Sequence, residues 1–371
     1  MTFVVTGIQE LQHMNIPLLK MSANRVRRNY SGGKILDTIQ GKENPKDSNY
    51  PEDWICSLVN ASNPGLAPIA NEGLSMINST VSLKDLISSN PMFYIGSNQS
   101  ADSLGFLTKW IDSAMRLHIQ AHPTKMFAQQ HMGLPNGKFE CYYILGSRES
   151  VKDPYIYLAF QRPPKDKQTW KQMIEEQDTD AILACFDKIP VEPGDVVYIP
   201  GGVPHAIGEG LLLLEVMEPS DLVVRCEFNR EGIIVPPEAR FMQRGIDFCL
   251  DIFDYQGYSV DQVKTNFFLK KKLIESSSSY RRFKLVEGSL SGCFSIDLVQ
   301  VVSSTAIPMD GTFAVGVCFA GRAQVLGDGI TISVGPLDSF FISAATQTVT
   351  IIPEGDEEVE IGIITPFDTQ S

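Results

Sequence analysis

The stretch HIQAHPTKMFAQQHMGLPNGKFE, residues 118–140, decides the fold prediction because it sets polar side chains at strand-like spacing within apolar sequence. Gln120 and His122 are two residues apart, so on a β-strand both side chains point to the same face. Glu140 opens the apolar run ECYYIL, which is typical of another strand. An amide, an imidazole and a carboxylate on strands can converge on one divalent metal ion inside a barrel.

A fourth candidate ligand lies further along the chain. His205 ends the segment VEPGDVVYIPGGVPH (191–205), in which a strand-like run is followed by a Pro-Gly-Gly turn. The turn glycines allow the backbone to bend sharply and aim His205 inward. Zinc accepts neutral imidazole nitrogen and carboxylate oxygen. The alternative is that Gln120, His122, Glu140 and His205 are unrelated polar residues, each satisfied by local hydrogen bonds.

Short strand-like runs separated by Gly, Pro and Asp turns predict a mostly β fold. The segment 193–205 resembles the second motif of the cupin β-barrels, and residues 334–351 repeat its strand–turn layout without any histidine. We therefore predict two cupin (jelly-roll) β-barrel units with a helical insertion. The first is a metal-binding catalytic domain over residues 1–274, and the second is a metal-free, cupin-like β domain over residues 281–371.

Several segments depart from this strand pattern. Charged sequence with apolar positions at helical period predicts the helical insertion at about residues 163–190. A further helix is predicted near 238–255, and a short one at 83–90. The run PMFYIG (91–96) predicts a strand, and the polar, Ser-rich ESSSSY (275–280) is the best candidate for a linker between the two units.

Composition restricts the classes of partner. The chain has 31 basic and 44 acidic residues and a net charge of −13, and such a surface field repels nucleic acid and anionic membranes. A small anionic substrate needs only a few local cations. The seven scattered cysteines form no CxxC pair, which argues against a disulfide framework or a Cys-zinc site. Residues 1–19 lack a signal-peptide pattern and no run is long enough to span a membrane, so we expect a cytoplasmic protein.

Four motifs, in order over roughly residues 30–235, resemble the type I mannose-6-phosphate isomerases. These are zinc-dependent cupin enzymes that interconvert mannose 6-phosphate and fructose 6-phosphate. The first motif is QAHPTKMFA (120–128), which resembles the family's Gln-x-His-Pro-x-Lys-x-x-Ala stretch. The second is KFECYYIL (138–145), and the third is PGDVVYIPGGVPHAI (193–207). The fourth is LLLLEVMEPSDLVVR (211–225), which resembles a strand pair carrying Glu and then Ser-Asp-x-x-x-Arg.

The resemblance implies a role for individual residues. One zinc ion per chain would be bound by Gln120, His122, Glu140 and His205. Arg225 would stabilise negative charge on the reacting oxygens, Glu215 would handle protons near the metal, and Lys138 would line the catalytic site. The substrate would be contacted by His118, Lys125 and Arg230.

These residue types suit the implied chemistry. Moving a carbonyl from C1 to C2 requires a base that takes a proton beside the carbonyl and returns it to the neighbouring carbon. A cation beside the oxygens of the intervening enediolate lowers the barrier. Simpler interpretations remain open: Glu215 and Arg225 would form a buried structural ion pair, and Lys125 and Lys138 would be surface lysines.

Two departures from the family pattern affect phosphate recognition. The position two residues before Gln120 usually holds a small serine that can contact phosphate, but here it is His118. A cation expected about six residues after Arg225 is replaced by Glu231, with Arg230 one residue earlier. The alternatives are therefore an isomerase of another sugar or sugar phosphate, and a non-catalytic, sugar-binding regulatory cupin. The sequence indicates no protein partner.

Overall fold

The computed structural model describes residues 15–97 and 100–367. Residues 1–14, which make up most of the N-terminal segment considered for a signal peptide, lie outside these ranges. Within them, every helix is too short or too polar to cross a membrane.

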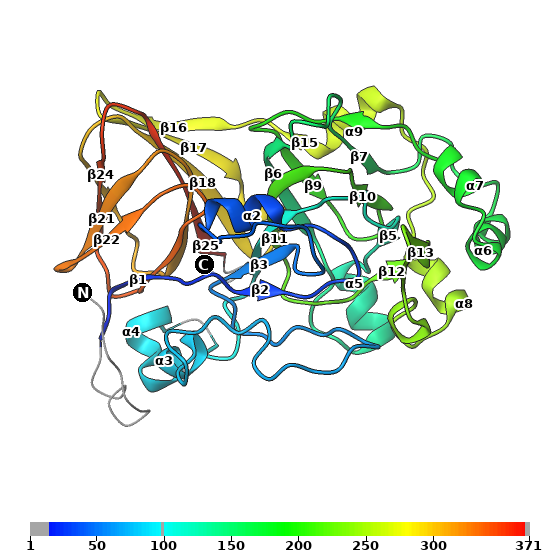
Figure 1. The fold of residues 1–371 in the computed structure, drawn as a ribbon, viewed down its shortest axis with the longest axis horizontal. Coiled ribbons are helices and arrows are strands. Elements are labelled where there is room, and N and C mark those ends of the chain that lie inside the picture. Colours follow the sequence, from blue (N-terminus) through cyan, green and yellow to red (C-terminus); the bar gives the residue numbers. More distant parts are fainter. Residues whose placement is uncertain (1–14, 98–99, 368–371) are drawn as a thin grey trace.

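Two antiparallel β-sandwiches lie side by side in the molecule (Figure 1). In the N-terminal unit, a seven-stranded sheet has the order β15-β9-β6-β11-β4-β3-β2 and faces a five-stranded sheet of order β12-β5-β10-β7-β8. The strands of the larger sheet are β2 Arg25–Val26, β3 Glu52–Ile55, β4 Leu107–Asp112, β6 Glu140–Ser147, β9 Val196–Ile199, β11 Leu211–Met217 and β15 Phe268–Leu269. Those of the smaller sheet are β5 Gln120–Ala121, β7 Tyr155–Leu158, β8 Ile189–Pro190, β10 His205–Ile207 and β12 Val224–Arg225. A separate hairpin joins β13 Asn229–Arg230 and β14 Ile233–Ile234.

The C-terminal unit repeats this arrangement with a seven-stranded sheet, β1-β23-β20-β25-β18-β17-β16, and a four-stranded sheet, β19-β24-β21-β22. The strands of the larger sheet are β1 Leu18–Lys20, β16 Lys272–Ser276, β17 Tyr280–Val286, β18 Phe294–Val301, β20 Ala314–Ala320, β23 Ser339–Ile342 and β25 Val359–Pro366. Those of the smaller sheet are β19 Thr305–Pro308, β21 Ala323–Gly327, β22 Ile330–Val334 and β24 Thr348–Pro353. The predicted mostly β fold with two cupin units is thus confirmed.

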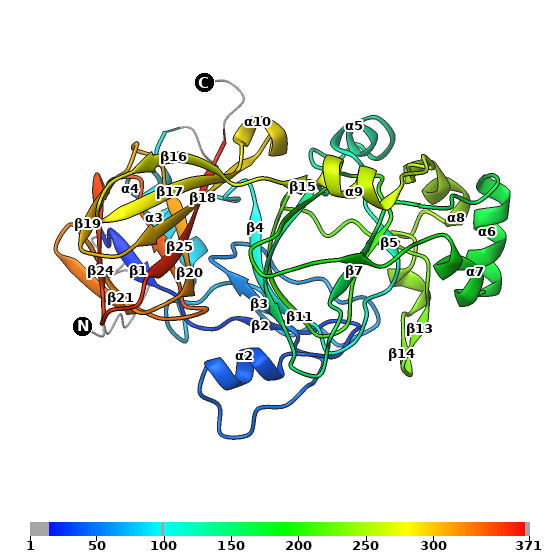
Figure 2. The ribbon, with the colours of Figure 1, turned by 90° about the horizontal axis from the view of Figure 1, so that it is seen from above.

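Helices lie at the edges of the sandwiches (Figure 2). The α-helices are α2 Lys34–Ile39, α3 Leu83–Ser89, α4 Pro91–Ile95, α5 Lys125–Phe127, α6 Lys167–Glu176, α7 Thr179–Ala184, α8 Ile246–Cys249, α9 Val260–Phe267 and α10 Gly288–Ser291. A π-helical turn spans Ala128–Met132, and 3-10 turns span Pro237–Ala239 and Leu250–Ile252. Helices α6 and α7 fall within the predicted insertion, and Trp170 of α6 anchors them by packing edge-on against Phe160 with ring centroids 5.1 Å apart.

The two seven-stranded sheets pack against each other through a shared hydrophobic core. Trp110 of β4 donates from its indole N–H to the carbonyl of Leu337 at 2.9 Å. Tyr143 of β6 stacks on Phe319 of β20 with ring centroids 4.3 Å apart. Burial of this apolar surface fixes the outer face of the N-terminal sheet, so its inner face is a rigid support for the side chains inside the barrel.

Two local predictions are wrong. The run PMFYIG (91–96) forms helix α4 and not a strand, because Pro91 occupies the first helical position and Asn90 accepts a hydrogen bond from the Phe93 N–H. A short apolar run fits either structure, and these capping residues decide between them. The helix predicted near 238–255 is broken into short turns, since Met242 and Gln243 adopt positive φ values of 51° and 59°.

The Ser-rich stretch ESSSSY is a hairpin turn, so its prediction as a linker is also wrong. It joins β16 to β17, which pair within the C-terminal sheet. The chain passes between the sheets at residues 270–271, because β15 still pairs with β9 of the N-terminal unit. Near the other end of the chain, β1 pairs with β23 and joins the C-terminal sheet. The division into domains 1–274 and 281–371 stays a prediction.

Candidate metal centre and adjoining cavity

Three buried side chains converge inside the N-terminal barrel. His122 follows β5, Glu140 begins β6 and His205 begins β10. Their potential ligand atoms all lie within 4.8 Å of one another. Nε2 of His122 is 3.1 Å from Oε1 of Glu140, and Nε2 of His205 is 3.3 Å from Oε2. The fold therefore brings together three of the predicted ligands, which lie up to 83 positions apart in the sequence.

Gln120 completes the predicted set. It pairs directly with His205 across β5 and β10, and its Nε2 lies 3.4 Å from Nε2 of His205. Rotation about the terminal torsion of an amide exchanges its nitrogen and oxygen, so Gln120 can present an oxygen to a cation at this point. Gln120 thus lies beside the three converging side chains, and its role as a fourth ligand stays a prediction.

Backbone carbonyls orient both imidazoles. Nδ1 of His122 lies 2.7 Å from the carbonyl oxygen of Leu222, and Nδ1 of His205 lies 2.9 Å from that of Val203. A proton held on Nδ1 by a carbonyl leaves Nε2 with a free lone pair. Both Nε2 atoms face Glu140, so the two rings offer their lone pairs to the same point.

Two turn glycines place His205 beside His122. A Cβ atom on Gly201 would lie 2.6 Å from Cα of Thr124, so only glycine permits this close approach of the two segments. Gly202 has a φ of +91° and donates its N–H to the carbonyl of His122 at 2.7 Å. The Pro-Gly-Gly turn therefore sets the distance between the two histidines.

The electrostatics of the cluster suit a metal ion. Burial, and then the nearby Lys138 cation, lower the pKa of His122 to about 3, so its imidazole is neutral at physiological pH. Burial alone would raise the pKa of Glu140, but Lys138 and His122 hold it well below its usual range. Within the described part of the chain, no hydrogen bond satisfies Nε2 of His122, although Oε1 of Glu140 lies close to it. The neutral imidazole of His122, with its unsatisfied buried nitrogen, and the carboxylate of Glu140 fit a divalent cation.

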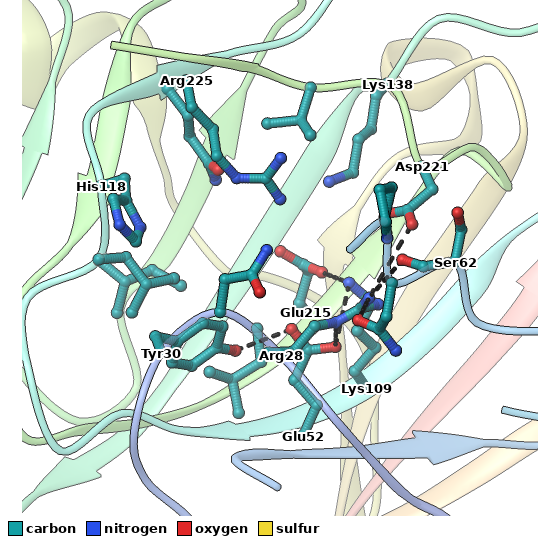
Figure 3. A pocket seen from close by; sticks show the side chains of 18 residues that line it. Arg28, Tyr30, Glu52, Ser62, Lys109, His118, Lys138, Glu215, Asp221 and Arg225 are labelled. Carbon is teal, nitrogen blue, oxygen red and sulfur yellow. Dashed lines mark hydrogen bonds and ion pairs between the residues drawn. The ribbon is translucent and has the colours of Figure 1, made fainter. Parts of the chain in front are cut away.

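Gln120 also lines a cavity beside this cluster. Figure 3 shows this cavity from close by. Lys138, Arg225 and His118 lie around one side of it, and Glu215 and Lys109 lie around another. Lys138 is buried and its Nζ lies 2.9 Å from Oε1 of Glu140. The interpretation of Lys138 as a surface lysine is therefore wrong.

Glu215 is buried and forms an ion pair, but not with Arg225. Its Oε2 lies 2.6 Å from Nζ of Lys109, so the alternative of a Glu215–Arg225 pair is wrong. Burial and the neighbouring Glu140 carboxylate raise the pKa of Glu215. Arg225 instead donates to the carbonyl of Ala239, and burial lowers its pKa to about 10, which leaves it charged near neutral pH.

A buried polar network on the far side of the cavity was not predicted. Glu52 accepts hydrogen bonds at 2.8 Å from each of three donors, the Tyr30 hydroxyl, the Trp54 indole and the Arg28 guanidinium. Nζ of Lys109 lies 3.7 Å from Glu52, so the network reaches Glu215. One sequence feature could have indicated this network, namely the charged Lys109 inside the otherwise apolar strand LTKWID (107–112). A charged residue is rarely buried without a partner, so Lys109 predicts a buried carboxylate nearby.

The three predicted substrate-binding residues differ in position. His118 is buried in the cavity wall, and no described residue makes a hydrogen bond to its Nε2. Burial, and then the Arg225 cation, lower the pKa of His118 to about 3. Arg230 is on β13, with Nη1 3.9 Å from Oε1 of Glu227. Lys125 begins α5 on the exposed surface and does not line the cavity.

Fold and site together define a two-unit cupin protein with a candidate metal centre and a charged cavity in its N-terminal barrel. No protein-family model matches the chain. A curated relative, mannose-6-phosphate isomerase from Streptococcus mutans, is 34% identical over 151 residues, which are 40% of this chain and 45% of that protein. The match thus spans less than half the length of that relative.

Solved structures extend the similarity to the whole fold. The mannose 6-phosphate isomerase from Bacillus subtilis superposes with a TM-score of 0.70 at 18% identity, covering 94% of this chain and 99% of that one. A mannose 6-phosphate isomerase bound with zinc and yttrium gives a TM-score of 0.65 at 18% identity, covering 95% and 100%. The 151-residue match confirms the resemblance to mannose-6-phosphate isomerases that the motifs indicate, and the solved structures show that the fold is shared.

Proposed function

We propose that this protein is a zinc-dependent aldose–ketose isomerase that interconverts mannose 6-phosphate and fructose 6-phosphate. The observation that carries the proposal is the buried His122, Glu140 and His205 cluster beside a cavity that also holds a buried acid, Glu215. Similarity to a mannose-6-phosphate isomerase over 151 residues supports this substrate.

One zinc ion per chain would be held by Gln120, His122, Glu140 and His205. When bound, zinc supplies a Lewis acid that polarises the substrate carbonyl. The carbonyls of Leu222 and Val203 keep the two imidazoles in the tautomer that such a cation requires.

Glu215 is our candidate for proton transfer. In the direction from aldose to ketose, its carboxylate would take the proton from C2 of the sugar and return it to C1 by way of an enediolate, while the hydroxyl proton on O2 passes to O1. Burial and Glu140 raise the pKa of Glu215, which brings the carboxyl group closer to the pH at which it must both accept and donate a proton. Lys109 lies against the same carboxylate and holds it in place.

Two cations would stabilise the negative charge that develops on the substrate oxygens. Arg225 is half-buried and keeps its charge near neutral pH, while Lys138 enters the cavity next to Glu140. Charges fixed in a site from which water is excluded stabilise an oxyanion more strongly than the same groups in solvent.

Phosphate recognition would involve His118 and Arg230. His118 offers a free ring nitrogen to the cavity; burial and then the Arg225, Arg230 and Arg116 cations lower its pKa, against the single opposing carboxylate of Glu227. This corner of the barrel is therefore electropositive, which favours an anionic group. Neither Lys125 nor Arg230 lines the cavity, so Arg230 would act on the phosphate from outside the wall, and the role of Lys125 stays a prediction.

His118 stands where the family resemblance implies a small serine, and its bulk favours a second candidate, an isomerase of another sugar or sugar phosphate. A coupled assay with zinc-loaded protein would compare mannose 6-phosphate, glucose 6-phosphate and unphosphorylated mannose. Turnover of mannose 6-phosphate alone supports the proposal, and turnover of another substrate supports the second candidate. Binding of mannose 6-phosphate without turnover of any of the three would refute both and indicate a sugar-binding module. A cytoplasmic location stays a prediction.

A further inference from the structure

A second cavity lies in the C-terminal barrel, far along the chain from the metal centre. Its volume is about 500 Å³, within the range of pockets that hold small organic molecules. Three adjacent strands, β17, β18 and β25, form one wall (Figure 2), and the turn after β19 forms part of another. No proposed catalytic or metal-binding residue lines it.

Strand alternation explains why this wall is polar. Lys284 of β17 is directly opposite Asp297 of β18, and Ser295 of β18 is directly opposite Thr365 of β25. Residues two apart on a strand share a face, so Arg282 points to the same side as Lys284. Other inward positions of β18 are filled by apolar side chains such as Val299, which is fully buried in the barrel core. One end of the barrel is therefore packed, and the other is lined with polar groups.

The charges on the β17–β18 wall of this cavity do not balance. Arg282 binds Oδ2 of Asp297 through Nε at 2.8 Å and Nη2 at 2.6 Å, and Nζ of Lys284 lies 2.5 Å from Oδ1. Two cations thus share one nearly buried carboxylate and leave one net positive charge. Asp310 at the rim is exposed, and its Oδ1 accepts hydrogen bonds from the N–H and hydroxyl of Thr312. It therefore caps its own turn and does not bind the two cations, although its charge at the rim offsets the excess on the wall.

Both cations retain donors for a ligand. Of the five guanidinium N–H groups of Arg282, the described contacts engage only those on Nε and Nη2. The Arg282 and Lys284 side chains are 23% and 20% exposed, so they reach into the cavity without being free in solvent. Asp297 holds both in place before any ligand arrives, which lowers the entropy cost of binding.

We propose that this cavity is a second ligand site, one that binds a small organic molecule through a phosphate or carboxylate group held by Arg282 and Lys284. An oxyanion there neutralises the excess charge and gains charge-assisted hydrogen bonds. Ser295 and Thr365 lie on the same wall and offer hydroxyls for the remainder of the molecule.

Calorimetric titration of the full-length protein with inorganic phosphate, glucose 1-phosphate and citrate tests this proposal. Wild-type protein is expected to bind at least one probe at this site. Arg282→Met removes the guanidinium N–H groups that would bind the anion. Lys284 remains to neutralise Asp297, so we expect the fold to be retained. Because a hydrogen bond to a charged group contributes strongly, this variant should lose at least about tenfold in affinity for that probe. Glucose 1-phosphate carries a phosphate group and citrate carries carboxylates, so a comparison of their affinities shows which anionic group the site prefers.

Arg281→Met is the matched control. Arg281 is on the same strand but faces the opposite side, is 49% exposed and pairs with Glu358 at 2.8 Å. Arg281→Met changes the net charge by the same amount as Arg282→Met and should leave binding of the probe unchanged. If thermal melting shows that Arg282→Met is unfolded, Lys284→Met replaces it. Failure of every probe to bind wild-type protein, or equal binding by the wild type and the cavity variant, overturns the proposal. Isomerase activity is not part of the readout, so the result is independent of the proposed function.

Discussion

Nζ of Lys109 lies 2.6 Å from Oε2 of Glu215, and the two buried residues are directly paired across β4 and β11. Burial by itself would lower the pKa of Lys109, but the carboxylates of Glu215 and Glu52 outweigh it and raise this pKa to about 12. Lys109 is therefore a permanent cation that joins the candidate proton-transfer acid to the polar network on the other side of the cavity.

Replacement of Lys109 by Met should strongly destabilise the protein. The substitution leaves the Glu215 carboxylate buried without its cation, and breaking a buried ion pair in this way costs about 3–5 kcal/mol. Urea denaturation measures the loss in unfolding free energy. Lys84 is the control, because it pairs with Asp102 at the surface. Lys84→Met should change the free energy of unfolding by no more than about 1 kcal/mol.

A double variant separates stability from catalysis at this pair. Lys109→Met combined with Glu215→Leu removes both charges, so most of the lost stability should return. Isomerase activity should stay absent because the proton-transfer carboxylate is gone. Activity close to wild type in the stable double variant would rule out the role proposed for Glu215.

Arg225 should affect turnover more than folding. If its cation stabilises the developing oxyanion, Arg225→Met should lower kcat about 10²–10³-fold, the usual effect of removing one such group. Arg244→Met is the control, since Arg244 is exposed and lies outside the cavity. Steady-state kinetics on both variants decide the matter. A change confined to KM would show that Arg225 binds substrate and does not stabilise the reacting oxygens.

His118 should contribute to substrate binding. His118→Ser removes a neutral ring nitrogen that faces the cavity, so KM for mannose 6-phosphate should rise roughly three- to tenfold with little change in kcat. The same kinetic measurement on unphosphorylated mannose should show no such rise. A lower KM in the variant would mean that the imidazole only narrows the cavity, contrary to the proposed contact.

The buried Arg116–Glu227 pair should make stability depend on pH. Burial alone would raise the pKa of Glu227, but hydrogen bonds from Arg116 and the Ile119 N–H lower it overall. A lowered carboxyl pKa stabilises the fold above the unfolded value of about 4.3, and this stabilisation is lost as pH falls through the folded pKa. Glu227→Gln should therefore be less stable than wild type by about 1–3 kcal/mol at pH 7.

Urea denaturation at several pH values tests whether the pKa of Glu227 is lowered in the folded protein. The gap between wild type and Glu227→Gln should shrink as pH falls below about 4, because the wild-type carboxylate becomes protonated. Glu231→Gln is the control, since its side chain is 62% exposed and lies 4.0 Å from Arg230. A gap of constant size from pH 7 to pH 3 would contradict the assigned direction of the pKa shift.

The fold was largely predictable from the sequence because period-two alternation and turn residues repeat along most of the chain. The errors fall where local patterns are ambiguous. PMFYIG has no periodicity long enough to separate strand from helix, and only the capping by Asn90 settles it. The polar composition of ESSSSY suits a hairpin turn as well as a linker, and the pairing of β16 with β17 is a long-range property.

The metal cluster was predictable for a related reason. His122, Glu140 and His205 each stand at a strand end beside Gly or Pro turns, so their direction follows from the motif. The partner of Glu215 was not predictable, because Lys109 and Glu215 are 106 positions apart and meet only through the register of β4 and β11. Cross-strand register depends on the whole sheet, and no local spacing encodes it.

The most direct test of the central claim is activity as a function of bound metal. Protein stripped with a chelator should lose turnover of mannose 6-phosphate, and activity should return in proportion to added zinc and level off at one equivalent per chain. His122→Ala should fail to recover at that stoichiometry, whereas His131→Ala, which alters an exposed histidine outside the cluster, should recover fully. Full turnover by the metal-free protein, or equal recovery by His122→Ala, would contradict the assignment of this cluster as the catalytic metal centre.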